Sequence, residues 1–580
     1  MRYRPLRHAV TVGMAALILS ACSDKPPVNP LLSHVPADTP YLFSVTKPLP
    51  DPLYRRMVAM SESQLDKMVR DSQRMADELA RIRAEQGGEP LPPDADVYLA
   101  MSVFQALATE MQGKLGKDGQ AELGFVPNAK ALAYGLGPFP VMRGEIADAA
   151  KVEALLQRIE QRSQTSAPRA SLAGQDYRRI PLGEELLLVV AVREQELVVG
   201  MLPTVAEAQL LPLLLGQQLP DTALTADTLT ELQSRYGFAG YGEGYVDFRR
   251  LARLFTGRDA GPVGDAWRSL SVELPQPSPG CQSLVDGFTD GVPRLALGIT
   301  DVQDHGYGMT AAYETSPAVA VHLQKLARPK PLPGMGLADD AMFSMGMDID
   351  VAALRAAIKA LMGFMVAEGG NCEWLEPQAI QAAMPKVDFM LGPMLGGLSG
   401  MYGQLTELHF DEQTLQPDAS TGGLLLAVSD PRGLVAMAAM MNPELAQLQL
   451  PEDGSAVAVP AELLPPQLGS LHLAAADGLL ALATGEGSAE RATAMLKAGR
   501  SDQPLLLAMG YDMGRFMGVM EKMMGLAADR LEAMGEAEQA RAVRDQADSF
   551  KTMGGQVGRI DMRVAPDAGG LIMQQQVELR

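Results

Sequence analysis

The sequence is poor in the residues that build metal and nucleophile sites. Its 580 residues include only six histidines and three cysteines. The histidines are isolated along the chain, and no two cysteines have the spacing of a zinc ligand pair. We therefore expect no metal site and no cofactor.

Sequence motifs of common enzyme classes are also absent. Gly397-Leu-Ser-Gly400 lacks the second spacing of a Gly-x-Ser-x-Gly nucleophile elbow, and Gly113–Lys117 is too short for a phosphate-binding loop. Five aspartates lie between a predicted strand and a predicted helix, where N-capping explains them. They are Asp148, Asp247, Asp350, Asp430 and Asp512. We predict no catalytic residue, with a hydrolase of dispersed active site as an alternative.

Long apolar runs and a positive charge balance are missing as well. No apolar run after residue 21 reaches the roughly 20 residues of a membrane-spanning helix. Acidic residues outnumber basic ones by 70 to 49, for a formal charge of -21. Such a surface repels nucleic acid, so we expect no nucleic-acid partner. At 47% apolar residues, the chain can bury large cores and form two or more domains.

The N-terminus has the pattern of a leader. Three arginines precede a short apolar run, Ala9–Ile18, which ends in Leu19-Ser-Ala-Cys22. This resembles the signal and lipobox of a bacterial lipoprotein. The resemblance implies that residues 1–21 are a signal peptide and that Cys22 carries lipid, including palmitate. It places the protein in the cell envelope, anchored to a membrane and facing the periplasm.

The residues after the cysteine refine this expectation. In lipoproteins an aspartate directly after the cysteine favours the inner membrane; Ser23 stands there, so we expect the outer membrane. Residues 22–36 are rich in proline and predict an extended tether. Val35-Pro-Ala-Asp-Thr-Pro40 then resembles the start of a family of bacterial envelope proteins whose activity is not established. That resemblance implies no catalytic residues.

Two cysteines remain in what would be an oxidising compartment. Cys281 and Cys372 both lie in loop-like settings, after Pro-Gly and Gly-Gly-Asn. We predict a disulfide between them, with two buried free thiols as the alternative. The bond would close a loop of about 90 residues and contribute roughly 4–5 kcal/mol in the chain-entropy model.

The predicted elements repeat along the chain. We predict an α+β fold with two tandem related lobes, residues 37–325 and 338–580, joined by a Pro-rich linker at 326–337. Several hairpin signals predict a largely antiparallel sheet in each lobe, with helices packed on one face. The paired landmarks are Phe43 with Phe343, Asp148 with Asp430, Gly200 with Gly485, and Asp247 with Asp512.

A glycine pattern marks the first lobe. Gly240, Gly242 and Gly244 alternate in a predicted strand, Phe238–Val246. Aligning the lobes on their aspartates places Leu505, Leu507 and Met509 at these positions. Strand glycines permit close approach of a backbone or a ligand. We expect either a helix or ring packed on the bare face, or an apolar pocket.

Methionine is abundant, with 35 residues, most of them in the second lobe. Met513, Met517, Met520 and Met524 share one face of a predicted helix. Flexible thioethers suit irregular cores and adaptable binding surfaces. The pattern therefore predicts core packing or an apolar groove.

Together these features predict a non-enzymatic, lipid-anchored envelope protein. It would bind a partner protein or act as a scaffold at the periplasmic face of the membrane. The glycine strand and the methionines favour an alternative, a carrier or chaperone for an apolar ligand or lipid. A flat exposed apolar surface would favour the first, and a buried pocket the second.

Overall fold

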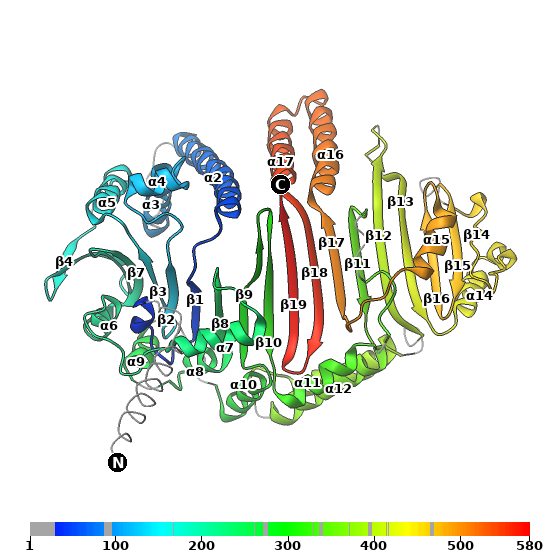
Figure 1. Cartoon of the computed structure of the whole chain (residues 1–580), viewed down its shortest axis with the longest axis horizontal. Coiled ribbons are helices and arrows are strands. Elements are labelled where there is room, and N and C mark those ends of the chain that lie inside the picture. Colours follow the sequence, from blue (N-terminus) through cyan, green and yellow to red (C-terminus); the bar gives the residue numbers. More distant parts are fainter. Residues whose placement is uncertain are drawn as a thin grey trace, which may run out of the picture.

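The computed structural model describes residues 30–85, 95–165, 167–259, 261–270, 277–328, 330–335, 340–369, 372–392, 397–412, 414–415, 417–464 and 469–580. The predicted signal peptide, Cys22 and residues 23–29 of the predicted tether lie outside these ranges. The remaining part of the predicted tether is not an extended linker, because Pro30–His34 forms a 3-10 helix and Leu31, Leu32 and Val35 are buried in the core. The described residues form an α+β structure around one antiparallel sheet of 19 strands (Figure 1). The predicted fold class, α+β with a largely antiparallel sheet, is confirmed.

The first half of the chain contributes strands β1 to β10. Their bounds are β1 Tyr41–Val45, β2 Ala131–Leu136, β3 Phe139–Glu145, β4 Arg169–Leu172, β5 Gln175–Leu182, β6 Leu186–Val192, β7 Glu196–Pro203, β8 Glu243–Asp247, β9 Arg294–Gln303 and β10 Gly306–Glu314. Side by side they run β4-β5-β6-β7-β3-β2-β1-β8-β9-β10, and every pair is antiparallel.

The second half contributes strands β11 to β19. Their bounds are β11 Phe343–Asp348, β12 Leu398–Phe410, β13 Pro417–Val428, β14 Val457–Ala458, β15 Leu471–Ala476, β16 Leu479–Thr484, β17 Leu507–Asp512, β18 Val557–Asp567 and β19 Gly570–Leu579. Their order is β14-β15-β16-β13-β12-β11-β17-β18-β19, again antiparallel throughout.

The two halves have the same strand order. With β4 set aside, β5, β6, β7, β3, β2, β1, β8, β9 and β10 correspond in turn to β14, β15, β16, β13, β12, β11, β17, β18 and β19. The last strands, β10 and β19, pair antiparallel from Gly306↔Glu578 to Glu314↔Gly570. The halves are therefore related by an approximate two-fold axis and share one continuous sheet, in place of two separate lobes.

The sequence landmarks match this correspondence only in part. Asp247 and Asp512 occupy the same place. Each ends a strand, caps the next helix and donates its amide N–H to the carbonyl of the residue just before the neighbouring strand, Pro40 before β1 and Met342 before β11. Because Asp247 and Asp512 correspond, Tyr41 of β1 corresponds to Phe343 of β11. The predicted pairing of Phe343 with Phe43 is therefore two residues out of register. Gly200 lies inside β7, whereas Gly485 follows the end of β16.

Sixteen α-helices are described between the strands. They are α2 Asp51–Glu85, α3 Ala95–Met111, α4 Lys117–Leu123, α5 Ala149–Ser163, α6 Glu207–Leu214, α7 Ala226–Tyr236, α8 Phe248–Phe255, α9 Pro262–Ser269, α10 Pro279–Gly291, α11 Pro317–Leu326, α12 Val351–Glu368, α13 Pro377–Met390, α14 Pro431–Met441, α15 Ser488–Lys497, α16 Met513–Ala533 and α17 Ala537–Gln556. The five aspartates cap α5, α8, α12, α14 and α16 as expected. No described helix is long and apolar enough to cross a membrane.

One face of the sheet, which we call the core face, carries the two largest cores. In the first half α6, α7 and α9 bury residues such as Leu42 and Tyr134 beneath them. In the second half α15 and the segment around Leu332 bury Tyr402 and Leu425. At the seam between the halves the core face turns polar, with Thr310, Gln574 and Arg563 in one cross-strand row.

Helices also gather at the two ends of the central strands. Figure 1 shows α16 and α17 beyond one end and α10, α11 and α12 along the other. At the α17 end, Arg74 of α2 pairs with Asp545 at 2.6 Å. At the other end, the disulfide Cys281–Cys372 joins α10 of the first half to the segment that follows α12 in the second half. Each end therefore ties one half to the other.

Candidate functional site

The face opposite the core face, here called the outer face, carries an unbroken apolar row. Each residue of the row is the register partner of the next, from β6 to β15. The row is Val190, Val199, Met142, Ala133, Phe43, Gly244, Leu297, Ala311, Met573, Val564, Leu507, Met347, Met401, Leu426, Leu480 and Ala475. At the usual strand spacing it is about 70 Å long.

A parallel row reinforces it across the seam and the second half. Its members are Ile299, Met309, Gln575, Met562, Met509, Met345, Gly403, Leu424 and Leu482. Gln575 is the only polar residue among them. The outer face is thus apolar over several neighbouring rows and not along a single line.

The two faces differ in exposure. Leu42 and its cross-strand partner Tyr134 on the core face are both 0% exposed, whereas Phe43, the next residue along β1, points to the outer face and is 37% exposed. Met142 and Met347 on the outer face are 59% and 37% exposed. Strands that are apolar on both faces normally bury both. A contiguous apolar surface left partly exposed marks an interaction site.

Among the described residues, helices cover the outer face near its two ends and over part of its centre. At one end Arg178 of β5 binds Glu153 and Glu160 of α5. At the other, Leu434 and Val435 of α14 pack against the end of the apolar row. In the centre, the first turns of α2 pack against Tyr307, Ile560 and Val577. The half-exposed surface lies between these covers.

Methionines supply much of the outer face. They are Met142, Met309, Met345, Met347, Met401, Met509, Met562 and Met573, drawn from seven strands. Thioether side chains adapt their shape to a variable apolar ligand. The sequence showed the high methionine content but did not point to these eight residues, because one or two methionines per strand have no signature until the strand pairing is known.

The predicted methionine groove on α16 is not formed as expected. Met513, Met517, Met520 and Met524 are half-buried, and Met517 lies against Gly554 of α17. A hollow of about 420 Å³ does lie beside α16, but Gly514, Gly518, Val519 and Met523 line its helical side. The four methionines are absent from that lining, because at least Met517 is used in packing α16 against α17.

The predicted row of glycines is also corrected. The strand begins at Glu243, and Gly240 lies before it with φ +85°, in a turn whose carbonyl accepts the amides of Thr46 and Lys47. Gly242 precedes the strand too. Gly244 is in the strand, and a Cβ there would lie 1.9 Å from the Leu42 carbonyl oxygen. It accommodates a close backbone approach and does not open a pocket.

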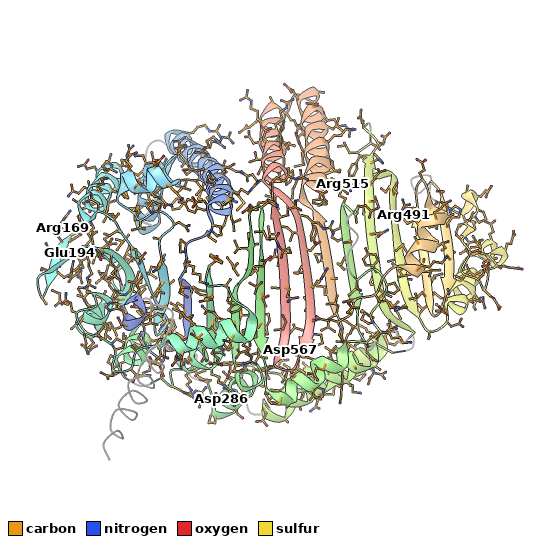
Figure 2. All side chains as sticks on the ribbon, viewed as in Figure 1. Arg169, Glu194, Asp286, Arg491, Arg515 and Asp567 are labelled. Atoms are coloured by element: carbon orange, nitrogen blue, oxygen red, sulfur yellow. A yellow bond between two sulfur atoms is a disulfide. The ribbon has the colours of Figure 1, made fainter. Side chains whose placement is uncertain are left out.

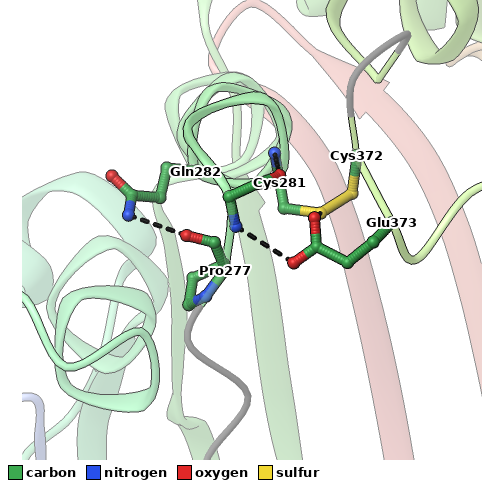
Figure 3. The surroundings of a disulfide bond; sticks show 6 residues. Pro277, Cys281, Gln282, Cys372 and Glu373 are labelled. Atoms are coloured by element: carbon green, nitrogen blue, oxygen red, sulfur yellow. Dashed lines mark hydrogen bonds between the residues drawn. A yellow bond between two sulfur atoms is a disulfide. The ribbon is translucent and has the colours of Figure 1, made fainter.

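The disulfide lies beside an acidic side chain (Figure 3). One Glu373 carboxylate oxygen is 3.3 Å from Cys281 Sγ, and the other accepts the N–H of Ser278 at 3.0 Å. Cys281, Cys372 and Glu373 are the only described group of His, Cys, Asp or Glu close enough together to hold a metal. With both sulfurs in the disulfide, the group has no thiolate to offer.

A serine and a histidine meet at the start of α15. Ser488 Oγ is 2.8 Å from His472 Nδ1 and 3.0 Å from Ser470 Oγ. Ser488 is only 3% exposed, and within the described ranges no carboxylate is bonded to His472. The pair therefore fixes the helix start on β15 and lacks the access and orienting group of a nucleophile.

The site that the described residues assemble is thus a non-polar one. Its chemistry is burial of apolar surface, and it brings no acid, base or nucleophile to the outer face rows. No protein-family model, no curated protein and no solved structure matches this chain.

Proposed function

We propose that this protein is a non-enzymatic, lipid-anchored envelope carrier that binds the acyl chains of a lipid on its outer face. The observation that supports this is the apolar row from Val190 to Ala475, which is partly exposed along its central length. An exposed apolar surface alone was expected to favour a protein partner, but the methionines on this face favour a ligand whose chains vary in length and kink.

The energetics favour a long apolar ligand. Each buried methylene contributes roughly 0.8 kcal/mol, so about 15 methylenes contribute roughly 12 kcal/mol before the losses of association. Those losses are of order 4–15 kcal/mol, so a short chain would bind weakly and a long or double chain well. A row of about 70 Å accommodates the long ones.

The cellular setting of the proposal rests on the lipobox resemblance. Acylation of Cys22 would tether the body to a membrane, and Ser23 favours the outer one. A tethered carrier meets lipid at the membrane surface. We therefore expect a Cys22→Ser variant to lose palmitate labelling while its folded body stays unchanged.

Native mass spectrometry tests the ligand. We would purify the Cys22→Ser protein from the periplasm without detergent and expect extra mass that extraction identifies as lipid. The double variant Met142→Asp/Met347→Asp should lose that mass, because a charge on each side of the seam disfavours an acyl chain. Gln574→Asp, an exposed change on the polar core-face seam, is the matched control. A wild-type protein without bound lipid would contradict the proposal.

A partner-binding or scaffold role is the second candidate. It is favoured by the openness of the outer face and by strongly exposed apolar side chains on neighbouring helices, Phe389 at 73% and Met440 at 84%. Photocrosslinking from position 142 in cells would separate the two. A protein crosslinked at stoichiometric yield, together with a lipid-free mass, would favour the partner.

A further inference from the structure

A separate hollow lies on the core face of the second half. It has a volume of about 390 Å³. Tyr402 and Gln404 of β12 form its floor, α15 forms one wall, and Pro333 with Gly334 forms the other. It is on the opposite side of the sheet from the apolar row.

The walls of this hollow are held in place by specific bonds. Arg500 donates to the Pro331 carbonyl at 2.6 Å, and Gly334 donates its amide to the Gly499 carbonyl at 3.0 Å. Gly334 has φ +84°, and a Cβ there would lie 2.8 Å from the Tyr402 ring. A glycine is therefore required for this segment to lie against the tyrosine, and the hollow is a built feature of the fold.

The charge of the lining is unusual for this chain. The protein has a formal charge of -21, yet the hollow is lined by Arg491 and Arg500 and by no aspartate or glutamate. Within the described ranges, neither arginine has a carboxylate oxygen within 4.0 Å. Burial raises the pKa of Asp348, and the charges of Arg328 and Arg500 offset only part of that rise; Asp348 is already paired with Arg328 at 3.1 Å.

The two arginines are only partly engaged. Arg491, on α15 (Figure 2), donates from one nitrogen to the carbonyls of Thr484 and Glu486 at 3.1 and 3.2 Å. A guanidinium has five N–H donors in a planar fork, which fits carboxylate and phosphate oxygens. Beside the arginines, Ala494, Met495 and Ala498 provide an apolar wall.

We propose that this hollow binds the carboxylate or phosphate group of a small organic anion between Arg491 and Arg500. The charge selects an oxyanion, and the apolar wall accommodates a short carbon chain attached to it. Because the hollow and the apolar row lie on opposite faces of the sheet, this site is independent of acyl-chain binding.

Titration calorimetry on the full mature chain tests the site. The probes are inorganic phosphate, glycerol phosphate, a four-carbon dicarboxylate and dihexanoyl phosphatidic acid. We expect at least one organic anion to bind, and Arg491→Gln/Arg500→Gln to weaken it roughly 10- to 100-fold, the range for charge-assisted hydrogen bonds. If the phosphatidic acid binds and glycerol phosphate does not, the ligand is identified as a lipid headgroup. If both bind, the ligand is identified as a soluble anion.

Two controls keep the result interpretable. Lys497→Gln removes one positive charge from the same helix at an exposed position outside the lining, and should leave binding unchanged. Arg500→Gln alone changes an exposed position and should fold normally. Weaker anion binding by this single variant would show that the effect of the double variant is not caused by misfolding. Binding weaker than about 1 mM for every probe, or equal binding by wild type and double variant, would overturn the site. The outer-face variant Met142→Asp/Met347→Asp should bind the anion normally, which separates this test from that of the carrier.

Discussion

Gly242 and Gly244 are two residues apart and have different surroundings. A Cβ at 244 would lie 1.9 Å from the Leu42 carbonyl oxygen, whereas at 242 the nearest atom would be Ile299 Cδ1 at 3.6 Å. We expect Gly244→Ala to lower the free energy of unfolding by about 1–3 kcal/mol, and Gly242→Ala to change it little. Urea unfolding of the two variants provides the comparison. Equal effects would argue against the backbone contact between β1 and β8.

His34 predicts a pH dependence. Burial, followed by the positive charge of Arg143, lowers the pKa of His34 from 6.5 to about 4, and its Nδ1 has no hydrogen-bond partner. The native state therefore keeps the ring neutral where the unfolded chain protonates it. The contribution of neutral His34 to the stability of the native state is therefore fully present above pH 6.5 and is lost as the pH falls through about 4.

Thermal unfolding between pH 7 and 4 measures this effect. The variant His34→Gln should show a flatter loss of stability on acidification than the wild type. An unchanged slope would mean that His34 does not carry the proton linkage.

Residue-level prediction from the sequence worked where the cause is local. The capping aspartates were predictable because an N-cap depends on residues three apart. The role of Gly244 was not, because the atom it avoids belongs to residue 42. Phe43 could be placed in a strand, but its match to Phe343 missed the register by two residues.

Among the elements, α5 is tied to the outer face of β5 by one buried cation. The Arg178 side chain is 4% exposed and binds both Glu153 and Glu160. We expect Arg178→Gln to lower the free energy of unfolding by about 2 kcal/mol. Hydrogen exchange should show α5 opening more readily in this variant. Arg169→Gln removes a 51% exposed partner of the same Glu153, and as the control it should have little effect.

The predicted element boundaries were right where they depend on nearby residues and wrong where a turn is held by residues distant in the sequence. The predicted helix after Asp247 is present. The strand expected from Phe238 starts later, because Gly240 turns to meet Thr46, nearly 200 residues earlier in the chain. The outer face could not be foreseen, since it exists only once eighteen strand pairings are in register.

At the scale of the molecule, the disulfide joins halves that otherwise meet through the seam and the helices at its ends. We expect Cys281→Ser/Cys372→Ser to lose roughly 4–5 kcal/mol in the chain-entropy model. Intact mass with and without reductant should differ by two hydrogen atoms in the wild type and not in the variant. A variant as stable as the wild type would mean that the seam alone fixes the halves.

Separating the halves offers a broader test. Residues 37–325 expressed alone would expose β10 as a long unpaired edge, and 338–580 would expose β19 in the same way. We expect each fragment to aggregate or self-associate, and the two co-expressed fragments to form a one-to-one complex. Light scattering distinguishes these states; two stable monomers would contradict a shared sheet.

The tandem organisation was predictable because the order of elements repeats, whereas the joining of the halves was not. The sequence pattern of β10 does not indicate that it pairs with β19. The register partners Thr310 and Gln574, for example, are far apart in sequence and both are polar, so no apolar pattern links them. The Pro-rich linker suggested separate lobes. As separate lobes, each half would leave one edge strand with unpaired backbone N–H and C=O groups. Pairing β10 with β19 satisfies the hydrogen bonds of both edges.

The pairing of β10 with β19 has an evolutionary consequence. An approximate two-fold axis between corresponding strands is the symmetry of an isologous dimer, in which one surface meets a copy of itself. A single ancestral half could close its sheet by pairing its last strand with that of a twin. Gene fusion would then preserve the contact while freeing each copy to diverge.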